Sequence, residues 1–378
     1  MPGREGSLPR SGVRALRWGG RRCGEAPASR SELAGCNPLD LTAALFRDLA
    51  GAVDISLPKS GSTTDPNEAG VTARKDLSAK PDQGSRQDLL LLVAVGILWG
   101  SAFPVIRAGI VAGAPPLVFA AVRYGLTAAF LVPLAFLSRA PFPERAPLVR
   151  SAVYGGLLII GLYGGLLYLG EQSTSGGFAA VLAASASFWS LLFGYALLPQ
   201  ERFGTSAIIG VAVGFVGVAV LVLPQLGSGP ATTLLGSMLV LAAVVSFSAG
   251  GVLLRRGIPV EPTLWTLSVQ FAVASALVGS LALAFGEPGT LGDSSRTLPA
   301  LAYLVAAPSI VGYVLYFRLH HRVGPARANL VVYVGPIVAV VVGALAFGES
   351  VTTVEVAGMA LIVIGLYLVQ RGRFSSAK

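Results

Sequence analysis

The sequence predicts an all-α integral membrane protein with ten transmembrane helices, arranged as two inverted five-helix repeats. Three observations predict this fold. Apolar residues make up 53% of the chain and charged residues only 12%, whereas about 25% charged residues is usual in soluble domains. From Asp88 onward the apolar residues form long runs separated by short polar connections. The chain also matches itself at one constant offset. A soluble enzyme is therefore not expected.

The first 87 residues differ from the rest of the chain. They carry 13 Lys and Arg and 10 Asp and Glu, and no apolar period is sustained. Such a segment buries too little apolar surface to offset the entropy lost on ordering. We therefore expect residues 1–87 to be a disordered N-terminal extension. The alternative is a translation start placed too far upstream, with the protein beginning near Val71 or Asp88.

The membrane part consists of ten apolar runs, each near the length of about 20 residues that spans a bilayer as a helix. We expect helices at 89–111, 116–137, 149–169, 177–198, 205–223, 232–254, 263–285, 298–317, 325–347 and 352–370. The connections are short, so neighbouring helices are antiparallel. This pattern predicts a first repeat over 88–223, a second over 231–370 and a basic tail over 371–378.

An internal repeat appears when the chain is aligned with itself at an offset of 148 residues. The matching pairs include Arg107 with Arg255, Gly164 with Gly312, Tyr168 with Tyr316, Glu201 with Glu349, Gly210 with Gly358, and Gly217 with Gly365. Each copy holds five helices, and because five is odd the second copy enters the membrane from the opposite side. Inverted repeats of this kind are typical of transporters.

The basic residues predict the orientation. If the N-terminus is cytoplasmic, the cytoplasmic side carries twelve Lys and Arg and the opposite side carries only Arg107 and Arg296. Cytoplasmic loops are enriched in Lys and Arg, so we expect both termini in the cytoplasm and the chain in the cell (inner) membrane. The net charge of +9 is thus an orientation signal. The lipid bilayer is the expected partner, and no nucleic acid is.

Five short motifs indicate a family. They are LWGSAF at 98–103, AVRY at 121–124, TSGGFAA at 174–180, PQER at 199–202 and FGES at 347–350. In this order and spacing the segment from Asp88 to Gln370 resembles EamA-type members of the drug/metabolite transporter superfamily. The resemblance implies a ten-helix carrier of small metabolites that works by alternating access. It also implies a cavity between the halves, lined by the first four helices of each repeat.

The chain departs from that family at two points. Members often have proline in the fourth helix, but the counterpart of Pro336 is Phe188, which puts a symmetric break of helices 4 and 9 in doubt. Small multidrug relatives couple to protons through a carboxylate in their first helix, and none stands at 89–111. Coupling through a group at a helix end, or facilitated transport, stays open.

Arg123 is the foremost candidate for substrate binding, because ionisable groups within a membrane are costly and are functional by default. A guanidinium can bind a carboxylate or phosphate bidentately; the alternative is snorkelling or bonding to helix-end carbonyls. Packing or an interfacial belt is the alternative for each aromatic candidate. The other candidate lining residues are Trp99, Tyr124, Tyr163, Tyr168, Gln270, Tyr313, Tyr316, Asn329 and Tyr333.

Two further residues are candidates for coupling or gating. Glu171 ends the third helix and would titrate if buried, unless it only caps or solvates a turn. Pro336 lies within the ninth helix. The spacing of Cys23 and Cys36 matches no metal site, and the chain has only two histidines. No nucleotide-binding loop or catalytic set is present, so we expect no metal, no cofactor and no enzyme activity.

These observations predict a secondary transporter of small polar organic metabolites such as amino acids, with export the favoured direction. A non-transporting membrane scaffold or lipid-handling module on the same fold is the alternative. The substrate, the direction of transport, the coupling ion and the choice between monomer and homodimer stay open at this point.

Overall fold

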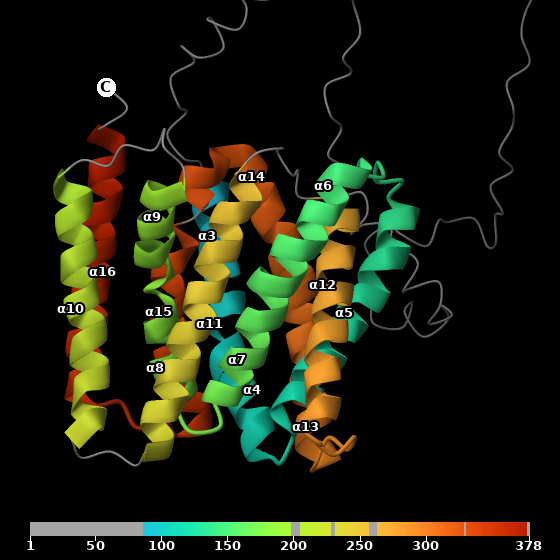
Figure 1. The fold of residues 1–378 in the computed structure, drawn as a ribbon, viewed down its shortest axis with the longest axis horizontal. Helices are drawn as coiled ribbons and strands as arrows, with labels where there is room; N and C mark the ends of the chain where they lie inside the picture. The colour runs from blue at the N-terminus through green and yellow to red at the C-terminus, as the bar shows by residue number, and fades with distance from the viewer. Residues whose placement is uncertain (1–85, 198–204, 228–230, 257–262, 329, 376–378) are drawn as a thin grey trace, which may run out of the picture. The chain divides into compact units, whose positions relative to one another are not determined.

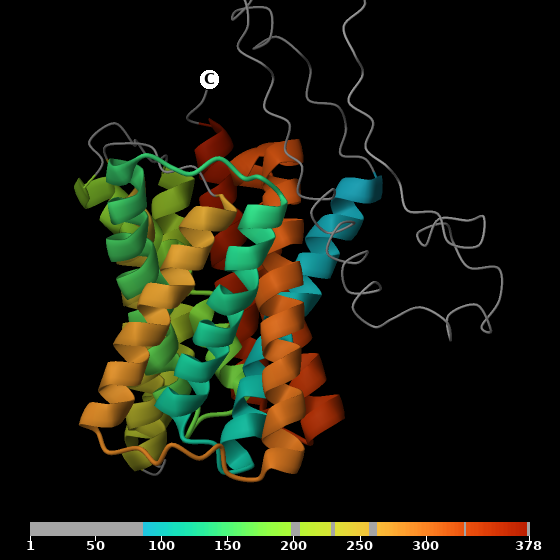
Figure 2. The same cartoon turned by 90° about the vertical axis from the view of Figure 1, so that its right-hand side faces the viewer.

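The computed structural model describes residues 86–197, 205–227, 231–256, 263–328 and 330–375. Residues 1–85 of the predicted extension and 376–378 of the predicted tail lie outside this part. The described residues form a bundle of ten helical runs (Figures 1 and 2). Eight runs are long and apolar enough to cross a membrane, and 334–347 and 353–369 are shorter apolar helices. The chain is therefore an all-helical membrane protein.

The helices follow the predicted order. Those of the first repeat are α3 Arg86–Gly100, α4 Ala102–Val111, α5 Pro116–Leu137, α6 Arg145–Arg150, the π-helix η2 Ser151–Leu162, α7 Tyr163–Gly170, α8 Gly176–Ala183, α9 Ala186–Leu197 and α10 Thr205–Gly227. Those of the second repeat are α11 Ala231–Arg255, α12 Leu264–Ala284, α13 Ser294–Leu304, the π-helix η3 Val305–Val311, α14 Gly312–Ala328, α15 Val331–Phe347 and α16 Thr353–Ser375.

Two of the predicted spans are interrupted. The first breaks at Ser101, between α3 and α4, where the Ser101 hydroxyl donates to the carbonyl of Leu98 at 3.1 Å. The fourth breaks at residues 184–185, between α8 and α9, although no proline stands there. In contrast, α15 is continuous across Pro336. The fourth and ninth helices are therefore not broken symmetrically.

The predicted boundary between the eighth and ninth helices is wrong. Helical structure runs from Ser294 through η3 to Ala328, and α15 begins at Val331, whereas the sequence predicts spans at 298–317 and 325–347. The apolar run ends before the helix does, because backbone hydrogen bonds can continue through polar residues once the chain leaves the apolar layer. Hydropathy locates the membrane-embedded part of a helix and not its backbone end.

The contacts between helices repeat when the two halves are exchanged. Helix α5 packs against α12, and α10 against α16. Helix α11 packs against α7 and η2, just as α3 and α4 pack against α14 and α13. Helix α9 contacts α11, just as α15 contacts α3. Two copies related by a pseudo-two-fold axis make these reciprocal contacts.

Helices α10 and α16 lie side by side at one edge of the bundle (Figure 1). Their glycines allow the two backbones to touch. A Cβ at Gly210 would lie 2.6 Å from the carbonyl oxygen of Gly365, and one at Gly217 would lie 2.9 Å from that of Gly358. Since Gly210 matches Gly358 and Gly217 matches Gly365 in the repeat, the two contacts are equivalent. Small residues at such crossings are typical of helix packing in lipid.

The start of α3 and the end of α16 lie at one end of the bundle (Figure 1). The connections 112–115, 171–175, 285–293 and 348–352 lie at the other, which we call the distal end. There the backbone N–H of Asp293 donates to the carbonyl of Ala112 at 3.1 Å. Gly292 has φ +66° and lies against Gly113, so a side chain at this position would collide with backbone. The distal end thus joins the two repeats directly.

Candidate functional site

Arg123 lies in the second turn of α5 and faces the second repeat. Its Nε and Nη2 donate to the hydroxyl of Ser309 at 3.3 and 3.1 Å, and its Nη1 donates to the hydroxyl of Tyr168 at 3.0 Å. The guanidinium also lies 5.8 Å from the ring centroid of Tyr124. Within the described residues Arg123 forms no ion pair with a carboxylate. Its partners among the described residues are two neutral hydroxyls and the ring of Tyr124.

A continuous series of aromatic ring contacts begins at Tyr124 beside this guanidinium and extends to Trp99. The ring of Trp99 lies 5.3 Å from that of Tyr313 and 4.9 Å from that of Tyr316. Phe271 continues the set, with its ring 5.6 Å from Tyr313 and 5.8 Å from Tyr124. Both repeats contribute to this central cluster, which consists of Trp99, Arg123, Tyr124, Tyr168, Phe271, Ser309, Tyr313 and Tyr316.

Two equivalent glycines make room for the cluster. A Cβ at Gly164 would overlap the hydroxyl of Tyr124, and one at Gly312 would lie 2.8 Å from Nε1 of Trp99. The indole N–H of Trp99 donates to the carbonyl of Pro308 at 3.1 Å, which holds the ring in place. The repeat therefore places a glycine in each half where the facing helix inserts an aromatic ring.

Six of the predicted lining residues meet in the central cluster; Tyr163 lies near it, and Gln270 contacts another residue. Gln270 donates from Nε2 to the hydroxyl of Ser151 at 2.8 Å, and Tyr163 packs against Phe247 with ring centroids 5.3 Å apart. Asn329 and the side chain of Tyr333 lie outside the described residues. The six that come together are Trp99, Arg123, Tyr124, Tyr168, Tyr313 and Tyr316.

Sequence reasoning missed two members of the cluster, Ser309 and Phe271. Ser309 is a neutral hydroxyl within a long apolar run, and its own hydroxyl donates to the carbonyl of Leu304 at 2.9 Å. A serine in a membrane helix commonly satisfies its hydrogen on the preceding turn. Serine and phenylalanine are both common in apolar membrane helices, so the sequence does not mark Ser309 or Phe271 as site residues. Only the packing of α5 against η3 and α12 brings them to Arg123.

A cavity of about 790 Å³ opens near the distal end, which is within the size range of small-molecule sites. Tyr303 forms part of its wall, and the hydroxyl of Tyr303 lies 2.7 Å from that of Ser101, at the break between α3 and α4. Both repeats contribute to the wall. The polar and charged lining residues are Arg107, Ser173, Thr174, Ser175, Ser295, Arg296, Tyr303, Glu349 and Ser350.

Two charged residues of this wall hold loops together. The Nη1 of Arg107 donates to the backbone carbonyls of Glu171 and Gln172, at 2.5 and 2.7 Å. The carboxylate of Glu349 accepts the backbone N–H groups of Gly176 and Gly177 at 2.9 and 3.0 Å. A carboxylate is favoured at this position because the N-terminus of α8 carries partial positive charge. Glu349 therefore fastens the second repeat to the first at the distal end.

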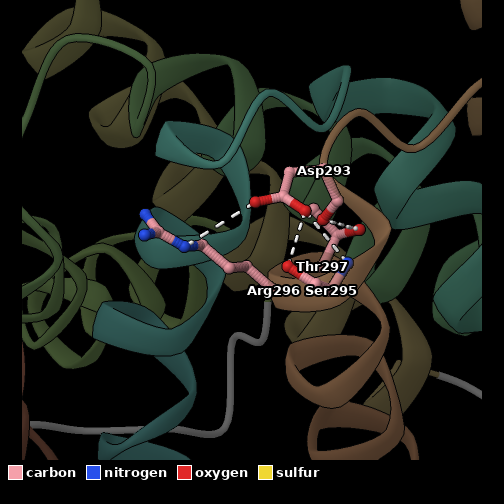
Figure 3. Close-up of polar contacts among 4 residues, drawn as sticks. All are labelled: Asp293, Ser295, Arg296 and Thr297. Atoms are coloured by element: carbon pink, nitrogen blue, oxygen red, sulfur yellow. Dashed lines mark hydrogen bonds and ion pairs between the residues drawn. The ribbon is translucent and has the colours of Figure 1, made fainter.

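At the rim of the cavity Asp293 caps α13 (Figure 3). One carboxylate oxygen accepts the backbone N–H of Ser295 at 3.0 Å and its hydroxyl at 2.7 Å. These hydrogen bonds keep the pKa of Asp293 below its ordinary value. The guanidinium of Arg296 extends from the helix to lie 3.7 Å from the other oxygen. Both side chains are largely exposed, so this ion pair contributes little stability.

The part of the chain that the structure describes contains no cluster of three His, Cys, Asp or Glu suited to a metal ion. The ionisable groups near the cavity are instead spread singly over several elements.

Known proteins resemble the chain over its membrane part. The "Uncharacterized inner membrane transporter YedA" of Escherichia coli K12 is 28% identical over 288 residues, which is 75% of this chain and 90% of that protein. The "Probable amino-acid metabolite efflux pump" of Salmonella typhimurium LT2 is 28% identical over 292 residues, which is 75% of this chain and 95% of that protein.

A solved crystal structure covers 75% of this chain and 98% of its own, with a TM-score of 0.52 and 21% identity. At that identity the likeness concerns the fold alone. The family pattern is more telling, because it occurs twice, once in each half. Residues 87–223 and 234–371 both match the EamA-like transporter family. With two such domains over most of its length, the chain belongs to the EamA-like transporter family of the drug/metabolite transporter superfamily.

Proposed function

We propose that the protein is a secondary transporter of small polar organic metabolites, with amino acids the favoured class and export the favoured direction. The observation that carries this proposal is Arg123, a guanidinium inside a membrane helix without an ion-pair partner among the described residues. The Salmonella typhimurium relative, named a probable amino-acid metabolite efflux pump, supports the substrate class.

The central cluster suits such a solute chemically. A substrate carboxylate can replace the hydroxyls of Ser309 and Tyr168 as the partner of Arg123, because a charged acceptor binds a guanidinium more strongly than a neutral one. The rings of Trp99 and Tyr313 offer an apolar surface to a side chain. Since the cluster draws on both repeats, exchanging the conformations of the halves would open it to one side of the membrane and then to the other.

Counterflow in proteoliposomes tests this proposal. We expect the wild type to exchange a radiolabelled mixture of L-amino acids. The exchange rate of Arg123→Ala should be lower by a factor of about 10 to 100, because a hydrogen bond to a charged group contributes about 1.5–3 kcal/mol. Arg123→Lys, which keeps the charge but not the bidentate geometry, should retain part of it. Arg145→Ala is the matched control, since Arg145 is exposed at the start of α6 and is not part of the cavity wall, and should transport normally.

Two results would contradict the proposal. Equal counterflow by Arg123→Ala and wild type would remove Arg123 from the binding site. No exchange of any solute across a broad metabolite panel, together with unchanged medium composition in cells with and without the gene, would favour the non-transporting scaffold or lipid-handling module.

A further inference from the structure

Glu171 is a buried carboxyl group at the end of α7. It directly follows α7, and its side chain is 0% exposed. Neither carboxyl oxygen has a hydrogen-bond partner among the described residues. An isolated carboxylate in such a place is very costly, and a buried carboxyl normally becomes neutral instead. No hydrogen bond among the described residues therefore explains why a carboxyl group is buried at this position.

Among the described residues no side-chain ion pair joins Glu171 to Arg107. Arg107 contacts Glu171 through the backbone carbonyl, and its second hydrogen bond goes to the carbonyl of Gln172. Glu349 acts on the carboxyl of Glu171 as a like charge, and Arg107 and then Arg123 act on it more weakly as opposite charges. Because Glu171 lies in the connection outside the spans, its ionisation is governed by burial first and by Glu349 second. Together they hold the pKa of Glu171 well above its ordinary value.

Within the part of the chain that the structure describes, the other elements around Glu171 bring no further charge. Helix α7 contributes the phenols of Tyr163 and Tyr168. Helix α8 has no ionisable residue, and α11, which packs along α7, has only Arg255, at its opposite end. The set of charges that face Glu171 thus consists of Arg107, Arg123 and Glu349.

The position of Glu171 links the cavity to the central cluster. Arg107, Glu349 and the nearby Ser173 line the cavity, whereas Glu171 itself is buried and is not part of the wall. On the other side Tyr168, three residues earlier and hence on the same face of the helix, holds the guanidinium of Arg123. A change of charge at Glu171 therefore acts on two places together. One is the pair of hydrogen bonds that Glu349 accepts at the N-terminus of α8, and the other is the guanidinium of Arg123.

We propose that Glu171 is a proton-binding site, reached from the cavity at the distal end, whose loading and release are coupled to movement of the solute. The neutral acid leaves Glu349 free to hold Gly176 and Gly177, as it does in this structure. Release of one proton to water in the cavity leaves a carboxylate that repels Glu349 and attracts Arg107, which loosens both loops. This coupling rests on the proposed transport function, whereas the proton site itself does not.

Infrared difference spectroscopy of the purified full-length protein tests the proton site without any solute. At neutral pH we expect the C=O band of a protonated carboxyl in the wild type and its loss in Glu171→Gln, which keeps size and burial. Glu355→Gln, a carboxyl at the start of α16 that hydrogen-bonds to the backbone of Thr352, should keep the band. Absence of the band from the wild type, or its persistence in Glu171→Gln, would overturn the proposal.

Proteoliposomes test the coupling. With an acidic lumen one pH unit below the outside, wild type should accumulate a radiolabelled L-amino-acid mixture by up to about tenfold for one-to-one exchange, and Glu171→Gln should not. Counterflow, which needs no gradient, should remain in that variant and shows that it is folded. Equal gradient-driven accumulation would overturn the coupling. Absence of counterflow from the wild type would instead contradict the proposed function, with the infrared result still deciding the proton site.

Discussion

At the scale of the residue, Arg123 and Ser309 show what single-sequence reasoning can find and what it cannot. A charge inside an apolar run is conspicuous, and Arg123 is brought by α5 into the middle of a polar and aromatic cluster. Ser309 supplies the acceptor for two of its donors but is one of many hydroxyls in membrane helices. Which hydroxyl faces a charge depends on the rotation of each helix, and apolar runs with little amphipathicity leave that rotation undetermined.

Replacing Ser309 by alanine tests this contact. The guanidinium loses the acceptor of its Nε and Nη2 atoms, so its position is no longer fixed, although its charge remains. We expect an apparent affinity for amino acids that is weaker by about tenfold, consistent with the loss of a hydrogen bond to a charged group, and an unchanged expression level. The measurement is the concentration dependence of counterflow. Ser280→Ala, an exposed serine on α12, should behave as wild type.

A second residue-scale prediction follows from Glu171. Because its pKa is raised in the folded state, the folded protein binds this proton more tightly than the unfolded chain. Wild-type stability therefore falls as pH rises above the ordinary carboxyl pKa, by up to about 1.4 kcal/mol per pH unit. Glu171→Gln lacks this dependence. Its melting temperature in detergent should exceed that of wild type increasingly between about pH 5 and about pH 8. A constant difference across that range would contradict the raised pKa.

At the scale of the element, hydropathy predicts the helices well where the apolar run and the helix end together. The predicted span 116–137 coincides with α5, which begins at prolines and ends beside Ser138. The eighth helix differs because α14 continues through polar residues to Ala328. The break between α8 and α9 was not expected, since no proline or charge stands at 184–185. Composition cannot reveal an interruption that is decided by packing.

The glycines between α10 and α16 give an element-scale prediction. A Cβ added at Gly210 would lie 2.6 Å from the carbonyl oxygen of Gly365, and neither backbone can yield without separating the helices. We expect Gly210→Ala to lower the free energy of unfolding by about 1–3 kcal/mol, measured by thermal unfolding in detergent. Gly251→Ala is the matched control, since nothing lies within 4 Å of its added Cβ. There the helix should gain about 0.5–1 kcal/mol.

At the scale of the whole molecule, the repeat in the sequence predicts the arrangement of the bundle. Arginine, tyrosine and glycine matches at one offset indicate two equivalent halves, and the exchange of helix contacts follows from that equivalence. The equivalence of the halves does not predict the cavity or the hydrogen bonds of Glu349 to Gly176 and Gly177. They depend on how the connections of the distal end meet across the halves, and loop contacts between distant segments leave no periodic trace in the sequence.

Cysteine labelling tests the predicted orientation of the whole molecule. In a background with Cys23 and Cys36 replaced by serine, Ser350→Cys at the cavity and Glu144→Cys at the opposite end are both exposed. We expect a membrane-impermeant maleimide to label Ser350→Cys in intact cells and Glu144→Cys only after permeabilisation, because the positive-inside rule places both termini in the cytoplasm. The reverse pattern would place the termini outside the cell and the cavity on the cytoplasmic face.

The reciprocal contacts of Gly210 with Gly365 and of Gly217 with Gly358 have a consequence for the origin of the chain. Each half contacts the other through the same surface, as the two subunits of an isologous dimer do. A single five-helix unit is thus complementary to itself. An ancestor half the present length could have assembled as a pair of identical subunits inserted in opposite senses, and gene fusion then only had to join partners that already fitted.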